Sequence, residues 1–213
     1  MKKIFLAAFI LTFCGFCAWS QAPKLKSKKI AEGVTASLPG NFYPMSNDDI
    51  AQRYPSTKKP LCMYTDMDRA VDFGLNESKS NWAGGDLKVL QQVYKSTILS
   101  LYKKVDFIQE GIKSIKKRDY IYFEFTCEAQ GNVKYTYLLY TVVNKKVFIF
   151  NFTCAQPEMK KWQETARAIM ESVKINPKKV SKNIIEQVNT DKKGGVPKQV
   201  LEEQKKNNPK KNK

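Results

Sequence analysis

Apolar residues recur along the chain at two different periods, and these periods predict its secondary structure. From about Asp86 to Lys104, apolar side chains return at every third or fourth position, which is the spacing of one face of an α-helix. A second segment, from about Pro157 to Lys174, repeats this spacing, and its proline is tolerated in a first helical turn. We therefore expect two long amphipathic helices, whose apolar stripes are Leu87, Leu90, Tyr94, Ile98, Leu101 and Val105 in the first and Trp162, Ala166, Ile169 and Val173 in the second.

Strands are predicted where apolar and polar residues alternate with a period of two. Three such runs follow one another in the second half of the chain, and the short links between them favour antiparallel neighbours. In these runs both alternating sets are apolar or aromatic, which is typical of strands that are covered on both faces. A short helix is expected from Ser46, which forms a capping-box pattern with Asp49, to about Tyr54. The expected strands are 34–38, 60–65, 70–76, 107–116, 120–128, 134–143 and 146–155.

The order of these elements indicates the fold class. A strand, a helix, two strands, a helix, four strands and a final helix predict an α+β domain over residues 33–175, with a mostly antiparallel sheet covered by helices on both faces. The strand 34–38 before Pro39 and Phe42, the aromatic strands 120–125 and 147–152, and the closing helix with Trp162 resemble the PsbP-like, MOG-type fold family. The resemblance implies a non-enzymatic binding or assembly domain. It carries over no functional residue, because no family motif is matched residue by residue.

The first twenty residues have the features of a secretory signal peptide. Two lysines precede the apolar run 4–18, and the small residues Ala18 and Ser20 lie before Gln21. The run is shorter than the roughly 20 apolar residues that a membrane-spanning helix needs, so we expect no transmembrane segment after cleavage. The prediction is an exported protein, periplasmic or secreted, in which residues 1–20 are removed and residues 21–32 form an exposed leader.

The composition limits the possible chemistry. The sequence has no histidine, which excludes hydrolytic triads built on that residue and removes the commonest general base near neutral pH. Catalysis would have to use carboxylates, lysine, tyrosine or a Ser–Lys dyad, and no spacing points to one of these. We therefore expect a binding or assembly role without a cofactor, and a histidine-free, carboxylate-dependent enzyme remains an alternative.

Three cysteines remain once residues 1–20 are removed. An odd number leaves at least one thiol free. In a simple meander of three strands, Cys127 and Cys154 would lie on the outer strands, about 10 Å apart, which is too far for a disulfide. We expect three buried thiols, and the alternative is one disulfide that includes Cys62.

The positive charge is concentrated near the C-terminus. The net charge is +17, and residues 174–213 hold twelve lysines against four acidic residues, a net charge of +8. Arginine, which base recognition favours, occurs four times, so specific nucleic-acid binding is not expected. The tail, 176–213, is expected to be largely disordered. It either docks on an anionic surface or is a disordered extension that keeps the protein solvated and binds nothing. The expected partner is an unknown envelope protein or an anionic polymer or lipid surface, with the tail as an alternative binding element through Lys178, Lys179, Lys182, Lys192, Lys193, Lys205, Lys206, Lys210 and Lys211.

Two further segments have side chains that could form a site. Asp66, Asp68 and Asp72 could supply oxygen ligands for calcium, but turn chemistry explains the same residues and no metal is expected. Trp82 lies in the segment 81–86 before the first long helix, where it is either a core residue or a partner contact.

Two acidic residues lie close together on one predicted strand. Glu124 and Glu128 could share a face with Tyr120 and Tyr122. Positions four apart on a strand are about 13 Å apart, beyond the separation that paired glycosidase carboxylates use. We interpret this group as a half-exposed sheet face near an edge.

Overall fold

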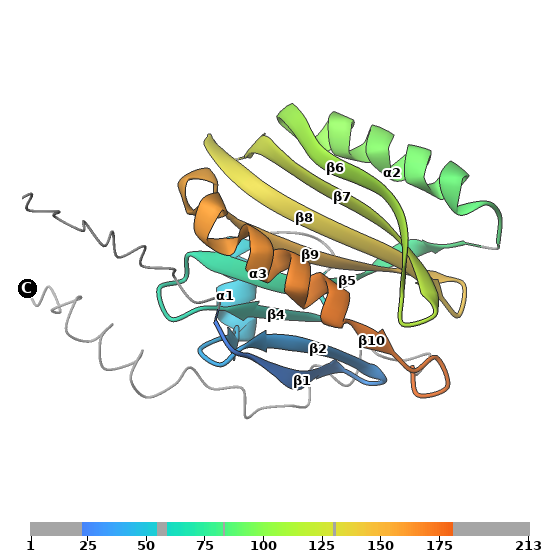
Figure 1. Ribbon diagram of the computed structural model, residues 1–213, viewed down its shortest axis with the longest axis horizontal. Coiled ribbons are helices and arrows are strands. Elements are labelled where there is room, and N and C mark those ends of the chain that lie inside the picture. The colour runs from blue at the N-terminus through green and yellow to red at the C-terminus, as the bar shows by residue number, and fades with distance from the viewer. Residues whose placement is uncertain (1–22, 55–58, 83, 130, 181–213) are drawn as a thin grey trace, which may run out of the picture.

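The computed structural model describes residues 23–54, 59–82, 84–129 and 131–180, which form two antiparallel sheets and their helices (Figure 1). In the large sheet the strands follow the order β3-β4-β5-β9-β8-β7-β6, and every pairing is antiparallel. Their bounds are β3 Tyr43–Pro44, β4 Cys62–Thr65, β5 Val71–Asn81, β6 Lys103–Ile115, β7 Arg118–Ala129, β8 Asn132–Val143 and β9 Lys146–Ala155. The expected antiparallel pairing of the three strands in the second half of the chain, as a simple meander, is therefore confirmed.

A small sheet has the order β1-β2-β10, with β1 at Leu25–Ala31, β2 at Val34–Pro39 and β10 at Lys174–Ile175. The expectation of an exposed leader over residues 21–32 is wrong for β1, which pairs with β2 from Leu25 opposite Pro39 to Ala31 opposite Val34. Most positions of β1 carry lysine or serine, so no apolar alternation marks it in the sequence. Backbone pairing with β2 makes it a strand.

The helices are α1 at Asn47–Arg53, α2 at Leu87–Leu101, the 3-10 turn η1 at Gln156–Glu158 and α3 at Met159–Ser172. The expected cap of α1 is confirmed, because the Ser46 hydroxyl accepts a hydrogen bond of 3.1 Å from the backbone N–H of Asp49. Asp86 caps α2 in a similar way, through the N–H of Lys88. The expected end of this helix at Lys104 is wrong, because the backbone after Leu101 becomes extended and Lys103 pairs in β6.

The apolar side chains form two main clusters that divide the large sheet by alternate position. One cluster holds Tyr120 of β7 together with Trp162 and Ile169 of α3. The other holds the adjacent residue Ile121 together with Ile98 of α2. Because neighbouring residues of a strand point in opposite directions, the aromatic character of both alternating sets is explained: each set belongs to a different cluster.

The three cysteines in the described part of the chain are free thiols, as expected for Cys127 and Cys154 from the meander. Cys127 lies opposite Lys134 of β8, and Cys154 lies opposite Tyr135 of the same strand, so β8 separates the two. Both are buried, whereas Cys62 is partly buried.

Candidate anion-binding site

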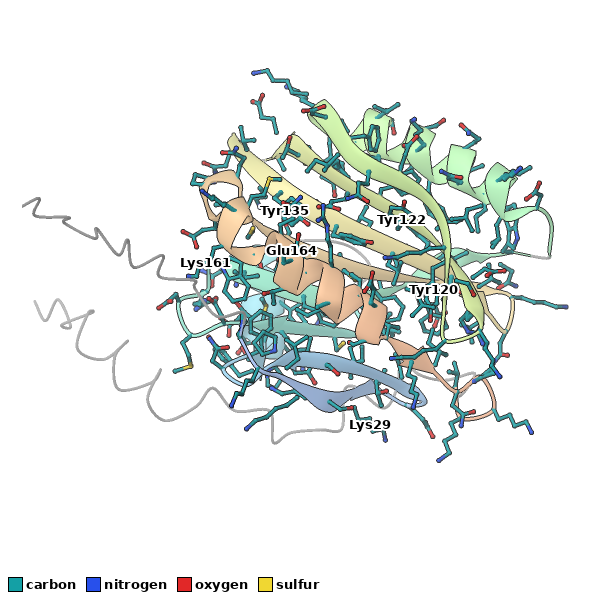
Figure 2. All side chains as sticks on the ribbon, viewed as in Figure 1. Lys29, Tyr120, Tyr122, Tyr135, Lys161 and Glu164 are labelled. Atoms are coloured by element: carbon teal, nitrogen blue, oxygen red, sulfur yellow. The ribbon has the colours of Figure 1, made fainter. Side chains whose placement is uncertain are left out.

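A groove lies where the small sheet meets one end of the large sheet. It is bounded by the β1–β2 turn, the β6–β7 turn and β10, and its volume is about 950 Å³. Figure 1 shows the β6–β7 turn beside β10, and Figure 2 labels Lys29 of β1 and Tyr120 of β7, which approach the groove from the two sheets. The lining consists of Lys29, Glu32, Gly33, Val34, Thr35, Ile115, Lys116, Arg118, Tyr120, Val173, Lys174, Ile175, Asn176, Pro177 and Lys179.

The floor of the groove is part of the core. Val34 and Val173 are fully buried, and Ile115 and Tyr120 are nearly so. Val34 lies in β2 opposite Ile175 of β10, so the pairing of these two strands positions this wall of the groove. A ligand would therefore rest on a packed surface.

The rim of the groove is strongly basic. Five cationic side chains line it against a single carboxylate, that of Glu32. Within the described part of the chain, none of these five cations takes part in an ion pair; Lys116 donates to the backbone oxygen of Ser172, and Arg118 Nη1 donates to that of Val142 at 3.0 Å. Uncompensated cations on a concave surface produce a positive potential that attracts anions. The cations are Lys29, Lys116, Arg118, Lys174 and Lys179.

Two titratable groups respond to this environment. Burial lowers the pKa of Lys116, and the positive charge of Lys174 lowers it further, as expected when two ammonium groups are near each other. Burial also raises the pKa of Tyr120 to about 12, against an opposing effect of Arg118. The Tyr120 hydroxyl is therefore protonated at neutral pH, and it can donate a hydrogen bond.

Glu32 differs from the rest of the rim. Its Oε2 atom is buried and has no hydrogen-bond partner among the described residues. A buried acceptor without a donor costs about 1–3 kcal/mol, and more when it is charged. The groove thus contains an unsatisfied carboxylate oxygen among cations.

The structure places only the first part of the predicted tail. Lys179 lines the groove and Lys178 lies beside it in sequence. The expectation of a largely disordered tail from residue 176 is wrong for residues 176–180. The N–H of Asn176 donates to the Gly33 carbonyl at 2.7 Å, and Val180 is buried against the core.

The close approach of this segment depends on Gly33. A Cβ atom there would lie 2.8 Å from the Asn176 carbonyl oxygen, which is too close for any other residue. Several predicted site residues lie outside the described part of the chain: Lys182, Lys192, Lys193, Lys205, Lys206, Lys210 and Lys211. The predicted signal peptide, 1–20, lies outside it as well.

Sequence reasoning missed the groove itself. Lys29, Lys116, Arg118 and Lys174 come from distant segments, and each alone has the appearance of an ordinary surface cation. The run Lys116-Lys117-Arg118 was the local signal, because three cations between two predicted strands create a dense positive charge. Only the pairing of β10 with β2 brings Lys174 to the same place.

The other predicted candidates lie away from the groove. Trp82 is partly buried and packs against the cluster that contains α2, and its backbone N–H donates to the Lys145 carbonyl at 2.6 Å. The Asp66 carboxylate accepts from the N–H groups of Ala70 and Val71, at 2.8 and 3.2 Å, so it has the role of a turn residue.

Asp72, a second acidic candidate, is engaged by a cation. Asp72 accepts a hydrogen bond of 2.7 Å from Arg53. Among the described residues, no group of three or more metal-ligating side chains is arranged to hold a metal ion.

Glu124 is buried, which contradicts the expectation of a half-exposed face. The side chain is 1% exposed, and it accepts hydrogen bonds from Arg167, Gln163 and Tyr135. Arg167 and Gln163 belong to α3, so side chains of this helix reach the Glu124 carboxylate. Glu128, four residues further, forms an ion pair of 3.0 Å with Lys104 instead, so the two carboxylates do not share a site.

Comparison of the sequence with known proteins does not identify it: no family model matches the chain, and no curated protein is significantly similar to it. In the described residues, no helix has the length and apolar character that crossing a membrane requires.

Comparison of the structure with solved structures finds similar folds. Cyanobacterial PsbP (CyanoP) from Synechocystis sp. PCC 6803 matches with a TM-score of 0.53 and 12% identity, over 76% of this chain and 99% of that chain. The Ran-binding protein Mog1p of Saccharomyces cerevisiae matches with a TM-score of 0.47 and 10% identity, over 71% of this chain and 96% of its own. LpqN of Mycobacterium tuberculosis, described as involved in cell envelope biogenesis, matches with a TM-score of 0.46 and 10% identity, over 72% and 91%. The likeness to CyanoP confirms the PsbP-like α+β fold that the sequence pattern predicted, and at this identity it defines the fold alone.

Proposed function

We propose that this protein is an exported, non-enzymatic binding or assembly domain that holds an anionic ligand or partner in the basic groove. In this proposal the PsbP-like domain is a helix-sheet-helix sandwich, with α3 on one face of the large sheet and α2 on the other. The observation that carries the proposal is the lining of the groove, with five cations and one carboxylate.

The distribution of ion pairs supports this assignment. Elsewhere in the described structure, carboxylates neutralise cations, as Glu110 does for Lys95 at 2.5 Å and Asp49 does for Arg69 at 2.6 Å. Among the residues that the structure describes, the five groove cations have no such partner, although they are gathered in one place. Mutual repulsion of like charges is unfavourable, and an anion in the groove would relieve it.

The groove also supports a binding role over a catalytic one. Catalysis by a pair of carboxylates, as in glycosidases, needs two such groups near the reacting atoms, whereas the groove has one, Glu32. The other ionisable groups there are cations and Tyr120, a composition that suits the holding of an anion. Sequence features of a signal peptide over residues 1–20 support export, and fractionation of cells that express the full chain would test it.

A second candidate is electrostatic association through the lysine-rich tail, with the domain as a spacer. It is favoured by the position of Lys179, which lines the groove shortly before the lysine-rich segment 181–213 begins. In this case the binding would depend on tail lysines rather than on the groove.

Heparin, a soluble polyanion, provides a test that separates the two. The protein is residues 21–213, and the groove variant is Lys29→Ala with Lys174→Ala. The matched control is Lys88→Ala with Lys160→Ala, which removes the same charge from exposed helix positions outside the groove. If the groove binds the anion, the slope of log affinity against log salt falls by about two for the groove variant, one for each lysine lost, and stays unchanged for the control.

The same assay identifies the second candidate. A full-length variant with the tail lysines 192, 193, 205, 206, 210 and 211 changed to glutamine keeps the groove intact. If the groove variant and its control lose equal affinity and the tail variant also loses affinity, binding in the groove is refuted and binding through the tail lysines is supported.

A further inference from the structure

Glu32 indicates what kind of anion the groove would take. A site for a purely anionic ligand gains nothing from a carboxylate, because Glu32 would repel it. Yet no described residue donates to the buried Oε2 atom of Glu32, even though five cations line the same groove. A ligand that carries both a negative group and a hydrogen-bond donor would satisfy the cations and this acceptor together.

The cations that would hold the negative group and the carboxylate that would accept the hydrogen bond come from different segments of the chain. Lys116 and Lys174 come from the β6–β7 turn and from β10, and they are near enough that the charge of one lowers the pKa of the other. Glu32 belongs to the β1–β2 turn, beside Gly33. Lysine ammonium groups are strong point charges that suit a phosphate group, and a carboxylate oxygen suits a hydroxyl donor.

The remaining lining fits a polar ligand of moderate size. Thr35, Asn176 and the protonated Tyr120 hydroxyl add neutral hydrogen-bonding groups to the groove. The volume of about 950 Å³ is at the upper end of the range for small-molecule sites, about 300–1,000 Å³. A sugar or polyol that carries a phosphate would fit this space with several hydroxyl groups in reach of polar atoms.

We infer that the groove recognises a phosphorylated polyol, with its phosphate held between Lys116 and Lys174 and one of its hydroxyl groups donating to Glu32 Oε2. This inference rests on the proposed function of the groove. The same chemistry occurs in free sugar phosphates and in the glycerol phosphate headgroups of lipids, and the experiment separates these two sources.

The test compares three small probes by calorimetric titration of residues 21–213: sn-glycerol 3-phosphate, inorganic phosphate and glycerol. Glycerol phosphate is expected to bind about tenfold more tightly than inorganic phosphate, the effect of one hydrogen bond to a charged group, and glycerol alone is expected not to bind. Lys174→Ala should weaken both phosphate-containing probes by the same factor.

Glu32→Gln is the decisive variant. Loss of its charge removes repulsion and strengthens the binding of inorganic phosphate, whereas glycerol phosphate also loses the hydrogen bond to the charged acceptor, so the affinity ratio of the two probes falls from about ten to near one. The control Glu164→Gln, on an exposed side chain of α3, should leave the ratio unchanged. If Glu32→Gln strengthens both probes equally and keeps the ratio, Glu32 does not accept a ligand hydroxyl and the inference is wrong.

Failure of the inference can be told from failure of the proposed function. If the groove variant loses heparin binding but neither phosphate probe binds, the groove is still an anion-binding site, and the inference that it recognises a phosphorylated polyol is wrong. For the source, vesicles of phosphatidylglycerol are compared with vesicles of phosphatidylcholine. If phosphatidylglycerol vesicles retain the protein and free glycerol phosphate competes with this retention, the ligand is a lipid headgroup. If the free probe binds tightly and the vesicles do not retain the protein, the ligand is soluble.

Discussion

The ion pair between Arg167 of α3 and Glu124 of β7 should hold the final helix on the sheet. Glu124 is 1% exposed and Arg167 is 28% exposed. Arg167 Nε donates to Glu124 Oε2 at 3.1 Å, and Nη2 donates to Oε1 at 3.0 Å, so the contact is bidentate. The same contact raises the pKa of Arg167. Arg167→Met would leave the buried carboxylate without its cation.

The expected cost follows from the burial of the two partners. Removal of one member of a fully buried pair costs about 3–5 kcal/mol. Here Arg167 is partly exposed, and solvent screening reduces its contribution. Glu124 also keeps hydrogen bonds from Gln163 at 2.6 Å and from Tyr135 at 3.0 Å. We therefore expect Arg167→Met to lower the free energy of unfolding by about 2–3 kcal/mol.

A double-mutant cycle isolates the pair. Glu124→Gln removes the charge but leaves an amide that Gln163 and Tyr135 can still contact. The double variant, Glu124→Gln with Arg167→Met, buries no unpaired charge, so it should be more stable than Arg167→Met alone. Urea unfolding near neutral pH, followed by circular dichroism, measures all four proteins.

The control uses the second partner of Arg167. Glu164 accepts from Arg167 Nη1 at 2.7 Å, but it is 78% exposed, so Glu164→Gln should change the stability by less than about 0.5 kcal/mol. If Arg167→Met costs less than about 0.5 kcal/mol, or if the two single changes simply add, the charge on Glu124 does not depend on Arg167 and the reasoning is refuted.

Two further predictions concern buried thiols and a tight contact. The thiols of residues 21–213 should resist a disulfide reagent at about pH 8 until the protein unfolds. The reason is that burial raises the pKa of Cys62 and of Cys154 to about 12. Fast labelling of the folded protein would contradict this prediction. Since the unfolded thiols lose protons from about pH 9, the free energy of unfolding should fall between about pH 9 and 12, and an increase in melting temperature over that range would be inconsistent with buried thiols. Gly74→Ala should lower the free energy of unfolding in urea by about 1–3 kcal/mol, because its Cβ would overlap the buried Met63 sulfur. Gly40→Ala has room for a methyl group and should change this free energy by no more than about 0.5 kcal/mol. Equal stabilities of the two variants would refute the overlap.

Elements with a strong local pattern could be predicted from the sequence. The alternation in 146–155 matches β9, Lys146–Ala155, residue for residue, and the stripe that includes Leu90 and Ile98 marks α2. The strand pattern and the helix pattern each lie within a single segment, since a helix or strand that packs on a core must repeat apolar residues at its own period. The order of these elements predicts the α+β class, and the PsbP-like fold was expected from the resemblance to that family.

Elements without a local pattern could not be predicted in this way. Strand β1 has lysine and serine at most positions, and it becomes a strand only because β2 pairs with it. Glu124 has the appearance of a half-exposed strand residue, and its burial depends on Arg167, 43 positions away. Neither the pairing nor the salt bridge has a signature within a single segment.

The sequence by itself determined the order of the elements that have a local pattern, the α+β class, the free thiols of the meander and the excess of positive charge, because each depends on composition or on short-range periodicity. The tertiary structure alone decided where that charge gathers. The β1–β2 turn, the β6–β7 turn and β10 are far apart in the chain, and sheet pairing brings Lys29, Lys116, Lys174 and Glu32 around one groove. A binding surface made from separate segments depends on long-range contacts, which the pattern of any one segment does not contain.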